Sequence, residues 1–87
     1  MTKEELVSKL TAAVGDTPYG RELIEEAETT FGDSEHKYGW DMKDRLDLRL
    51  AILKAYARID KTFGKEARET ADEDKIAITD KALKAIE

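Results

Sequence analysis

The sequence predicts an all-α fold, a small four-helix, bundle-like domain with a long central third helix. Apolar residues recur at the three- and four-residue steps of amphipathic helices, and glycines separate the segments that carry this pattern. Hydrophobic and charged residues each make up 40% of the chain, which favours a folded domain over a disordered chain or a membrane span. We therefore treat residues 1–87 as a single helical domain.

The first two helices are predicted at residues 3–14 and 18–31. Gly15 follows the first helical pattern and is a typical helix end. Thr17 is the predicted cap of the second helix, because the proline after it suits the first helical position. Gly32 is the predicted end of that helix. A linker this short predicts that the two helices form an antiparallel pair.

The third helix is predicted to run over residues 41–63, after a loop at residues 32–40 that could include one helical turn starting at Ser34. The segment contains no proline or glycine, and its large apolar side chains cover an arc of about 200° at helical spacing. An arc this wide needs neighbours on two sides, either other helices of the chain or a helix of another chain. Gly64 is the predicted end.

The last segment allows several interpretations. A short helix at residues 80–86 would have Thr79 as its cap, whereas a longer helix could run from Asp74 to the end. Residues 75–79 could instead form a short extended segment. The sequence therefore leaves the structure of residues 65–79 open.

The predicted core draws on all four helices. It comprises Leu6, Leu10, Val14, Leu23, Ala27, Phe31, Leu46, Leu50, Leu53, Ile59 and Leu83.

The second predicted helix is acidic, with Glu22, Glu25 and Glu26 close together. Glu22 and Glu26 repel each other at four-residue spacing, so a positive group is expected nearby. We expect ion pairs from this helix to Arg45 and Arg49 at the start of the third helix. The functional alternative is that the glutamates bind a basic protein or mimic DNA phosphate.

The loop at residues 32–40 holds the only histidine and the only tryptophan. One interpretation makes His36 a proton carrier in a ligand or catalytic site. The structural alternative is that Tyr38 and Trp40 cover one end of the core. No nucleophile, phosphate-binding loop or zinc spacing accompanies the loop, and with no cysteine we expect no metal and no cofactor.

The third helix also carries charges that need explanation. Lys54, Arg58, Lys61 and Lys65 form a basic stripe, but the chain has a net charge of −5 and lacks a nucleic-acid-binding motif, so nucleic acid is an unlikely partner. Asp60 falls inside the apolar arc, where an unpaired carboxylate would be costly. We expect Asp60 to be exposed or paired.

These observations predict a small helical protein–protein interaction or self-association module without catalytic activity. The partner-binding residues are predicted to be Glu22, Glu25, Glu26, His36, Tyr38 and Trp40. The alternatives are an engineered or designed structural bundle, and a small-ligand or catalytic site in the loop from His36 to Trp40. The absence of cysteine and of an apolar leader at the start predicts a cytoplasmic protein with no membrane association.

Overall fold

The computed structural model describes residues 3–38 and 45–87, with only the backbone described for residues 33–38, 45–47, 62 and 63. The elements are α1 (Lys3–Val14), α2 (Pro18–Tyr38), α3 (Arg45–Arg58), the π-helical turn η2 (Ile59–Phe63), α4 (Lys65–Glu69) and α5 (Asp72–Ala85). The described residues contain helices and no strand, so the predicted all-α class is confirmed.

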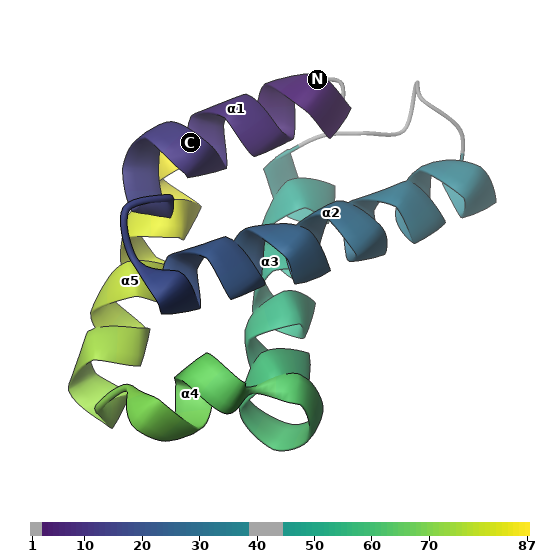
Figure 1. Ribbon diagram of the computed structural model, residues 1–87. Coiled ribbons are helices and arrows are strands. Elements are labelled where there is room, and N and C mark those ends of the chain that lie inside the picture. Colours follow the sequence, from purple (N-terminus) through teal and green to yellow (C-terminus); the bar gives the residue numbers. More distant parts are fainter. Residues whose placement is uncertain (1–2, 39–44) are drawn as a thin grey trace.

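The helices form two layers of two. The helices α1 and α2 run antiparallel, as predicted, and cross over α3 and α5, which also run antiparallel to each other (Figure 1). Contacts join α1 to α2 and α5, α2 to α3, and α3 to α5. The short α4 links η2 to α5. A long central third helix is not confirmed, because α2 has 21 residues and α3 has 14.

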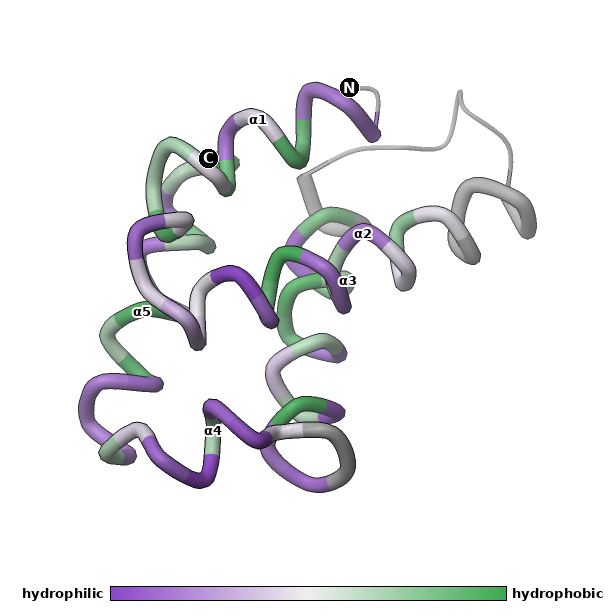
Figure 2. Tube along the Cα trace, in the orientation of Figure 1, coloured by the Kyte–Doolittle hydropathy of each residue, from purple (hydrophilic) through white to green (hydrophobic). Residues whose placement is uncertain are grey.

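One apolar core lies between the two layers, and its residues alternate with polar positions along each helix (Figure 2). Most of the predicted core residues are buried: Leu6, Leu10, Val14, Leu23, Ala27, Phe31 and Ile59. Leu83 packs against this core but is only partly buried, and the side chain of Leu46 lies outside the described residues. The spacing pattern therefore located the inner faces of α1 and α2 correctly.

The prediction that Leu50 and Leu53 belong to the core is wrong. They are 44% and 43% exposed. The buried side of α3 instead consists of Leu48, Ala51, Ile52 and Ala55, followed by Ile59. Small alanines allow neighbouring helices to approach closely. The alanines of α3 therefore face the other helices, although they carry little apolar area, and the two leucines face outward.

Two helix boundaries also differ from the prediction. The predicted end at Gly32 is wrong, because α2 continues to Tyr38. A side chain at Gly32 would meet nothing within 4 Å, and a helical glycine at such a position costs only about 1 kcal/mol relative to alanine. Residues 33–38 of the expected loop are therefore helical, and residues 39–44, which include the expected start of the third helix, lie outside the described residues.

A π-helical turn, which is wider than a turn of α-helix, follows α3 directly. The residues Ile59–Phe63 form the π-helical turn, and Gly64 follows it as predicted. A Cβ atom at Gly64 would lie 2.0 Å from the Ile59 carbonyl oxygen and 2.5 Å from the Ala67 Cβ. Only glycine leaves room for this close approach of η2 and α4.

The final helix agrees with the longer helical interpretation of the sequence, a helix from Asp74 to the end, except that it begins two residues earlier and ends at Ala85. Both the short helix at residues 80–86 and the extended segment at residues 75–79 are wrong, because α5 spans Asp72–Ala85. Three acidic residues occupy its first turn, where negative charge is favoured by the helix dipole. Thr79 is not a cap, since its hydroxyl donates to the Lys75 carbonyl oxygen inside the helix (2.8 Å).

The corner between α1 and α2 is tightly built. Thr17 caps α2 as predicted, with its Oγ1 accepting from the Gly20 amide (3.0 Å). Arg21 donates to the Gly15 carbonyl oxygen at the end of α1 (3.1 Å). A Cβ atom at Gly20 would lie 1.8 Å from the Val14 carbonyl oxygen, so the start of α2 passes directly against the end of α1.

Candidate partner-binding surface

The outer side of α3 carries apolar residues that the core does not use. Leu50, Leu53 and Ala57 follow one another at steps of three and four, so they share one side of the helix. All three are exposed. Isolated exposed leucines are common on protein surfaces, but a row of apolar residues on one helix face is typical of an interaction surface.

The neighbouring helix α5 adds Ile76 to this surface. Lys75 Nζ lies 2.5 Å from Asp60 Oδ1, which holds α5 beside the end of α3. The far flank of α5, including Ile78 and Lys81, lines a surface pocket of about 550 Å³ with the start of α2. Ile76 lies on the opposite flank by helical spacing, toward α3, and is 60% exposed.

We refer to Leu50, Leu53, Ala57 and Ile76, with the charged residues that border them, as the α3/α5 face. Its α3 edge carries the exposed lysines Lys54 and Lys61, seven residues apart. Its α5 side carries the exposed acidic residues Glu73, Asp80 and Glu87, and also Lys84, which pairs with Asp80 at 3.1 Å. Arg49 is exposed four residues before Leu53 and therefore lies on the same side of α3. The apolar residues of the face are thus bordered by charges of both signs.

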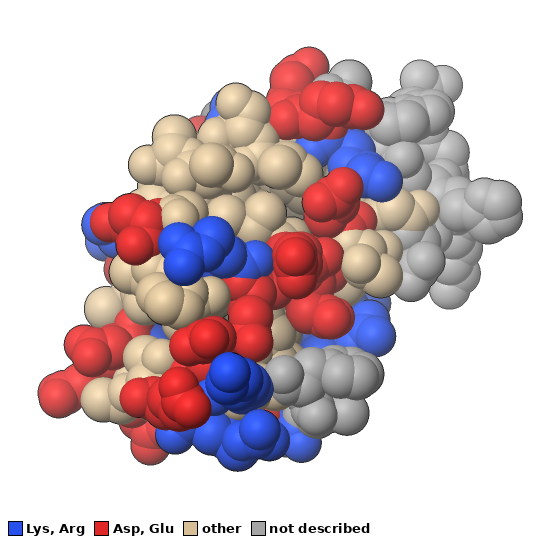
Figure 3. Space-filling view, in the orientation of Figure 1, with Lys and Arg blue, Asp and Glu red and all other residues tan. Residues whose placement is uncertain are grey.

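The acidic residues predicted on α2 lie close together on the opposite layer, where Figure 3 shows carboxylates gathered over the middle of the molecule. Glu22, Glu25 and Glu26 surround a small hollow of about 90 Å³ above Ile59. Among the described residues, these three are the predicted partner-binding residues whose side chains can be placed. His36 and Tyr38 have a helical backbone, and Trp40 lies outside the described residues.

Two of these glutamates make internal contacts. Glu26 Oε2 pairs with Arg58 Nε at 3.4 Å, a separation that is electrostatic and does not give a well-formed hydrogen bond. Glu22 Oε1 accepts from the Glu66 amide (3.5 Å). The ion pair observed between the second and third helices therefore lies at the end of α3, at Arg58, and not at Arg49 near its start as predicted, because the middle of α2 crosses α3 near its end. The side chain of Arg45 lies outside the described residues.

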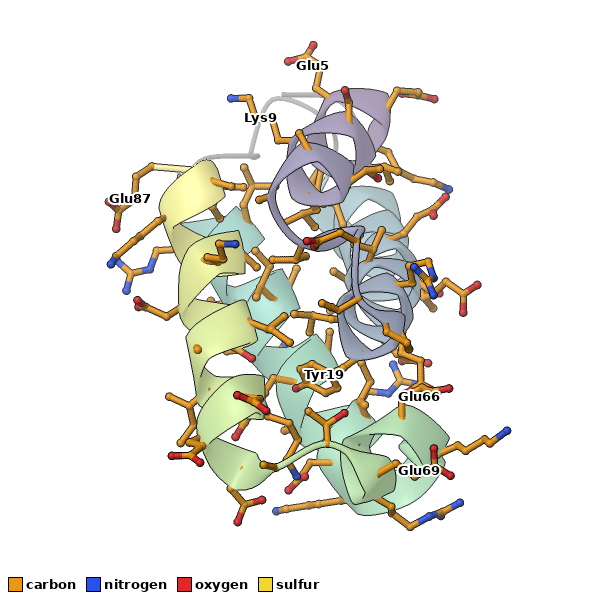
Figure 4. The ribbon with its side chains drawn as sticks, turned by 60° about the vertical axis from the view of Figure 1, so that its left-hand side comes forward. Glu5, Lys9, Tyr19, Glu66, Glu69 and Glu87 are labelled. Atoms are coloured by element: carbon orange, nitrogen blue, oxygen red, sulfur yellow. The ribbon has the colours of Figure 1, made fainter. Side chains whose placement is uncertain are left out.

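A polar cluster is buried where α2, α3 and α5 meet. The Tyr19 side chain points from the start of α2 toward α5 (Figure 4), and its residue is only 1% exposed. Its hydroxyl has no hydrogen-bond partner, although the Thr79 hydroxyl, which donates to the Lys75 carbonyl oxygen, lies near it. Burial raises the pKa of Tyr19 above its ordinary value, an effect that the nearby Thr79 hydroxyl partly opposes.

Lys75 is the buried charge of this cluster. Hydrogen bonds to Asp60 and to Asp72 raise the pKa of Lys75 above its ordinary range. The expectation that Asp60 is exposed or paired is confirmed, since its side chain is 42% exposed and is paired with Lys75. Lys75 is not predictable from the sequence, because its partner Asp60 lies on another helix. The one local signal is Asp72, three residues earlier.

The Tyr19 phenol gives a pH-dependent prediction. In the unfolded chain it ionises near its ordinary pKa of about 10, whereas the folded chain keeps its proton to higher pH. The stability from this difference is complete below about pH 10 and is lost as the pH rises above it. The raised pKa of Lys75 acts in the same direction. We expect the free energy of unfolding to fall above pH 10.

Replacing Tyr19 with phenylalanine should reduce this fall in the free energy of unfolding above pH 10. At pH 7, Tyr19→Phe should leave the free energy of unfolding unchanged or raise it by about 1 kcal/mol, because it removes a buried hydroxyl without a partner. Urea unfolding from pH 7 to 11 measures both effects, with Tyr56→Phe at a partly buried tyrosine as the control. A loss above about 1 kcal/mol at pH 7 would mean that the hydroxyl has a partner.

Comparisons with protein-family models, with curated proteins and with solved structures give no significant match to this chain. Within the described residues, no group of three histidine or acidic side chains is arranged to hold a metal ion. None of the described helices has both the length and the apolar character needed to cross a membrane. The surface therefore has to be interpreted from its own residues.

Proposed function

We propose that the protein is a small helical interaction module that binds a protein partner or a second copy of itself, and that it has no catalytic role. The observation that supports this most is the row of Leu50 and Leu53 on the outer side of α3. In a chain this small, every buried leucine would add to a limited core. Leaving two large apolar residues on one exposed face is best explained by a function at that face.

The α3/α5 face is a better candidate than the glutamates of α2. Glu22 and Glu26 have buried oxygen atoms and contacts within the chain, so a partner would have to compete for them. Leu50 and Leu53 would instead lose exposed apolar area on binding, at about 25 cal/mol for each Å² removed from water. We propose that the glutamates of α2, with His36, Tyr38 and Trp40, contribute at most to a secondary contact.

A double substitution on this face tests the proposal. Leu50→Lys with Leu53→Lys should preserve the helical circular dichroism spectrum, because both sites are exposed, and should weaken partner binding at least about tenfold. The matched control is Ala12→Lys, which adds a charge at an exposed position of α1. Binding is measured as self-association by light scattering, and as retention of other proteins on the immobilised chain.

The decisive comparison is between the double variant and the control. A complex formed by the wild-type chain and by Ala12→Lys, but lost in the double variant, supports the proposal. If the double variant forms every complex that the wild-type chain forms, or if the wild-type chain forms none, the proposed function is wrong.

A further inference from the structure

The pocket between the start of α2 and the flank of α5 opposite Ile76 is a second candidate site. Its volume of about 550 Å³ lies within the range of about 300–1,000 Å³ that small-molecule sites in proteins occupy. None of the residues that define the α3/α5 face lines it, so the pocket is a separate feature of the molecule.

The walls of the pocket are mainly apolar. Pro18 and Tyr19 of α2 contribute to one wall, and Ala77 and Ile78 of α5 contribute to the other. The Tyr19 side chain lies between the two helices (Figure 4), and its residue is only 1% exposed. An apolar pocket of this kind favours a ligand with an apolar body.

Both walls are fixed by contacts within the chain. Thr17 caps α2 and Arg21 donates to the end of α1, so the start of α2 is tied to α1. Lys75 ties the first turns of α5 to Asp60 and pairs with Asp72 inside the helix. Because the walls are already in place, a ligand that enters the pocket pays little for ordering the chain.

Two charged side chains that line the pocket, Asp74 and Lys81, are exposed. Neither has an ion-pair partner among the described residues, whereas Asp80, on another side of α5, is paired with Lys84. The lining therefore offers one negative and one positive charge to a ligand.

The spacing of these two charges sets the length of the ligand. Asp74 and Lys81 are seven residues apart on α5, which is about 10.5 Å along the helix axis. An extended chain of three residues spans at most about 10–11 Å. A tripeptide that lies along α5 can therefore place its amino group at Asp74 and its carboxylate at Lys81, with its side chains beside Ile78.

We propose that this pocket binds a short apolar peptide of about three residues whose amino and carboxyl ends are both free. The peptide amino group pairs with Asp74, the carboxylate pairs with Lys81, and apolar side chains contact Pro18 and Ile78. A longer polypeptide would bring only one of its ends to the pocket and would leave one of the two charges without a partner. This site adds a small-ligand function to the proposed interaction module and does not depend on the α3/α5 face.

Isothermal titration calorimetry with the tripeptide alanyl-leucyl-alanine tests the proposal. The wild-type chain should bind it with a dissociation constant below about 1 mM. Acetylating the amino end or amidating the carboxyl end of the peptide should raise the dissociation constant at least about fivefold, because each change removes one ion pair.

Charge exchange in the pocket tests the two contacts. Asp74→Lys or Lys81→Asp alone should raise the dissociation constant at least about fivefold. The chain with both substitutions should return to within about threefold of the wild-type value, because the peptide can then bind in the reverse direction. Asp80→Lys makes the same change of charge outside the pocket lining and should leave the dissociation constant unchanged. Circular dichroism melting of each variant excludes unfolding as the cause of lost binding.

Three outcomes would overturn the proposed site: no binding of the tripeptide at about 10 mM, equal binding of the free and the blocked peptides, or a double variant that binds no better than either single variant. The chain with Leu50→Lys and Leu53→Lys should bind the tripeptide as the wild type does. Failure of the proposed interaction surface and failure of the peptide site are therefore distinguishable.

Discussion

Truncating Ile52 to alanine should lower the free energy of unfolding by about 2–5 kcal/mol, whereas truncating its neighbour Leu53 should cost less than about 1 kcal/mol. Ile52 is fully buried between the helix layers, and Leu53 is 43% exposed. The two substitutions remove side chains of equal size from adjacent positions of one helix. The difference between them therefore reports the orientation of α3 rather than its helix propensity.

Urea unfolding followed by circular dichroism gives both values, at a concentration low enough for the chain to be monomeric. Leu50→Ala is a second control, because Leu50 is exposed to the same extent as Leu53. Equal losses for Ile52→Ala and Leu53→Ala would mean that the helix is rotated about its axis relative to the arrangement described above. The orientation of the α3/α5 face would then also be wrong.

Gly20→Ala should be the most damaging single-methyl addition in the described part of the chain, with a loss of about 3 kcal/mol. The new Cβ would lie 1.8 Å from the Val14 carbonyl oxygen and 2.7 Å from Thr17 Oγ1. The first of these is a backbone atom, so α1 and α2 would have to move apart at their corner. Val14 and Tyr19 would then lose core contacts on the two sides of the corner.

Gly32→Ala is the matched control, since it adds the same methyl group to the same helix. Nothing lies within 4 Å of the position where its Cβ would be, and alanine is the better helix former. We expect Gly32→Ala to raise the free energy of unfolding by about 0.5–1 kcal/mol. Thermal and urea unfolding measure both variants. A loss on Gly32→Ala would contradict the continuation of α2 beyond residue 31.

Local signals predicted the first half of the fold well. The steps of four in α1 and α2, the Thr17 cap and the glycine that follows α1 are all properties of neighbouring residues, and they were sufficient for the α1–α2 pair. For α3, the apolar residues cover so wide an arc that the pattern does not show which side of the helix is buried. The side of the arc that is buried depends on which helices lie against it, and no local residue specifies that.

The same limit applies to the candidate surface. Leu50 and Leu53 belong to the functional proposal because they are exposed, whereas apolar patterning assigns all leucines of the arc to the core. A signal was present in Ala51 and Ala55, whose small side chains mark a closely packed side. The partner of Asp60 was likewise beyond sequence reasoning, since the Lys75 amine reaches it from a helix that begins after α4.

The contact between α1 and α5 has a consequence for how the chain is made. The α1–α2 pair joins segments close in sequence and can form soon after both have been synthesised. Its inner face, which includes Leu6 and Leu10, is completed only when α5 is available to cover it. During synthesis the apolar side chains of the α1–α2 pair therefore stay exposed to water until α5 leaves the ribosome. In this interval a chaperone has a binding site that the folded protein lacks.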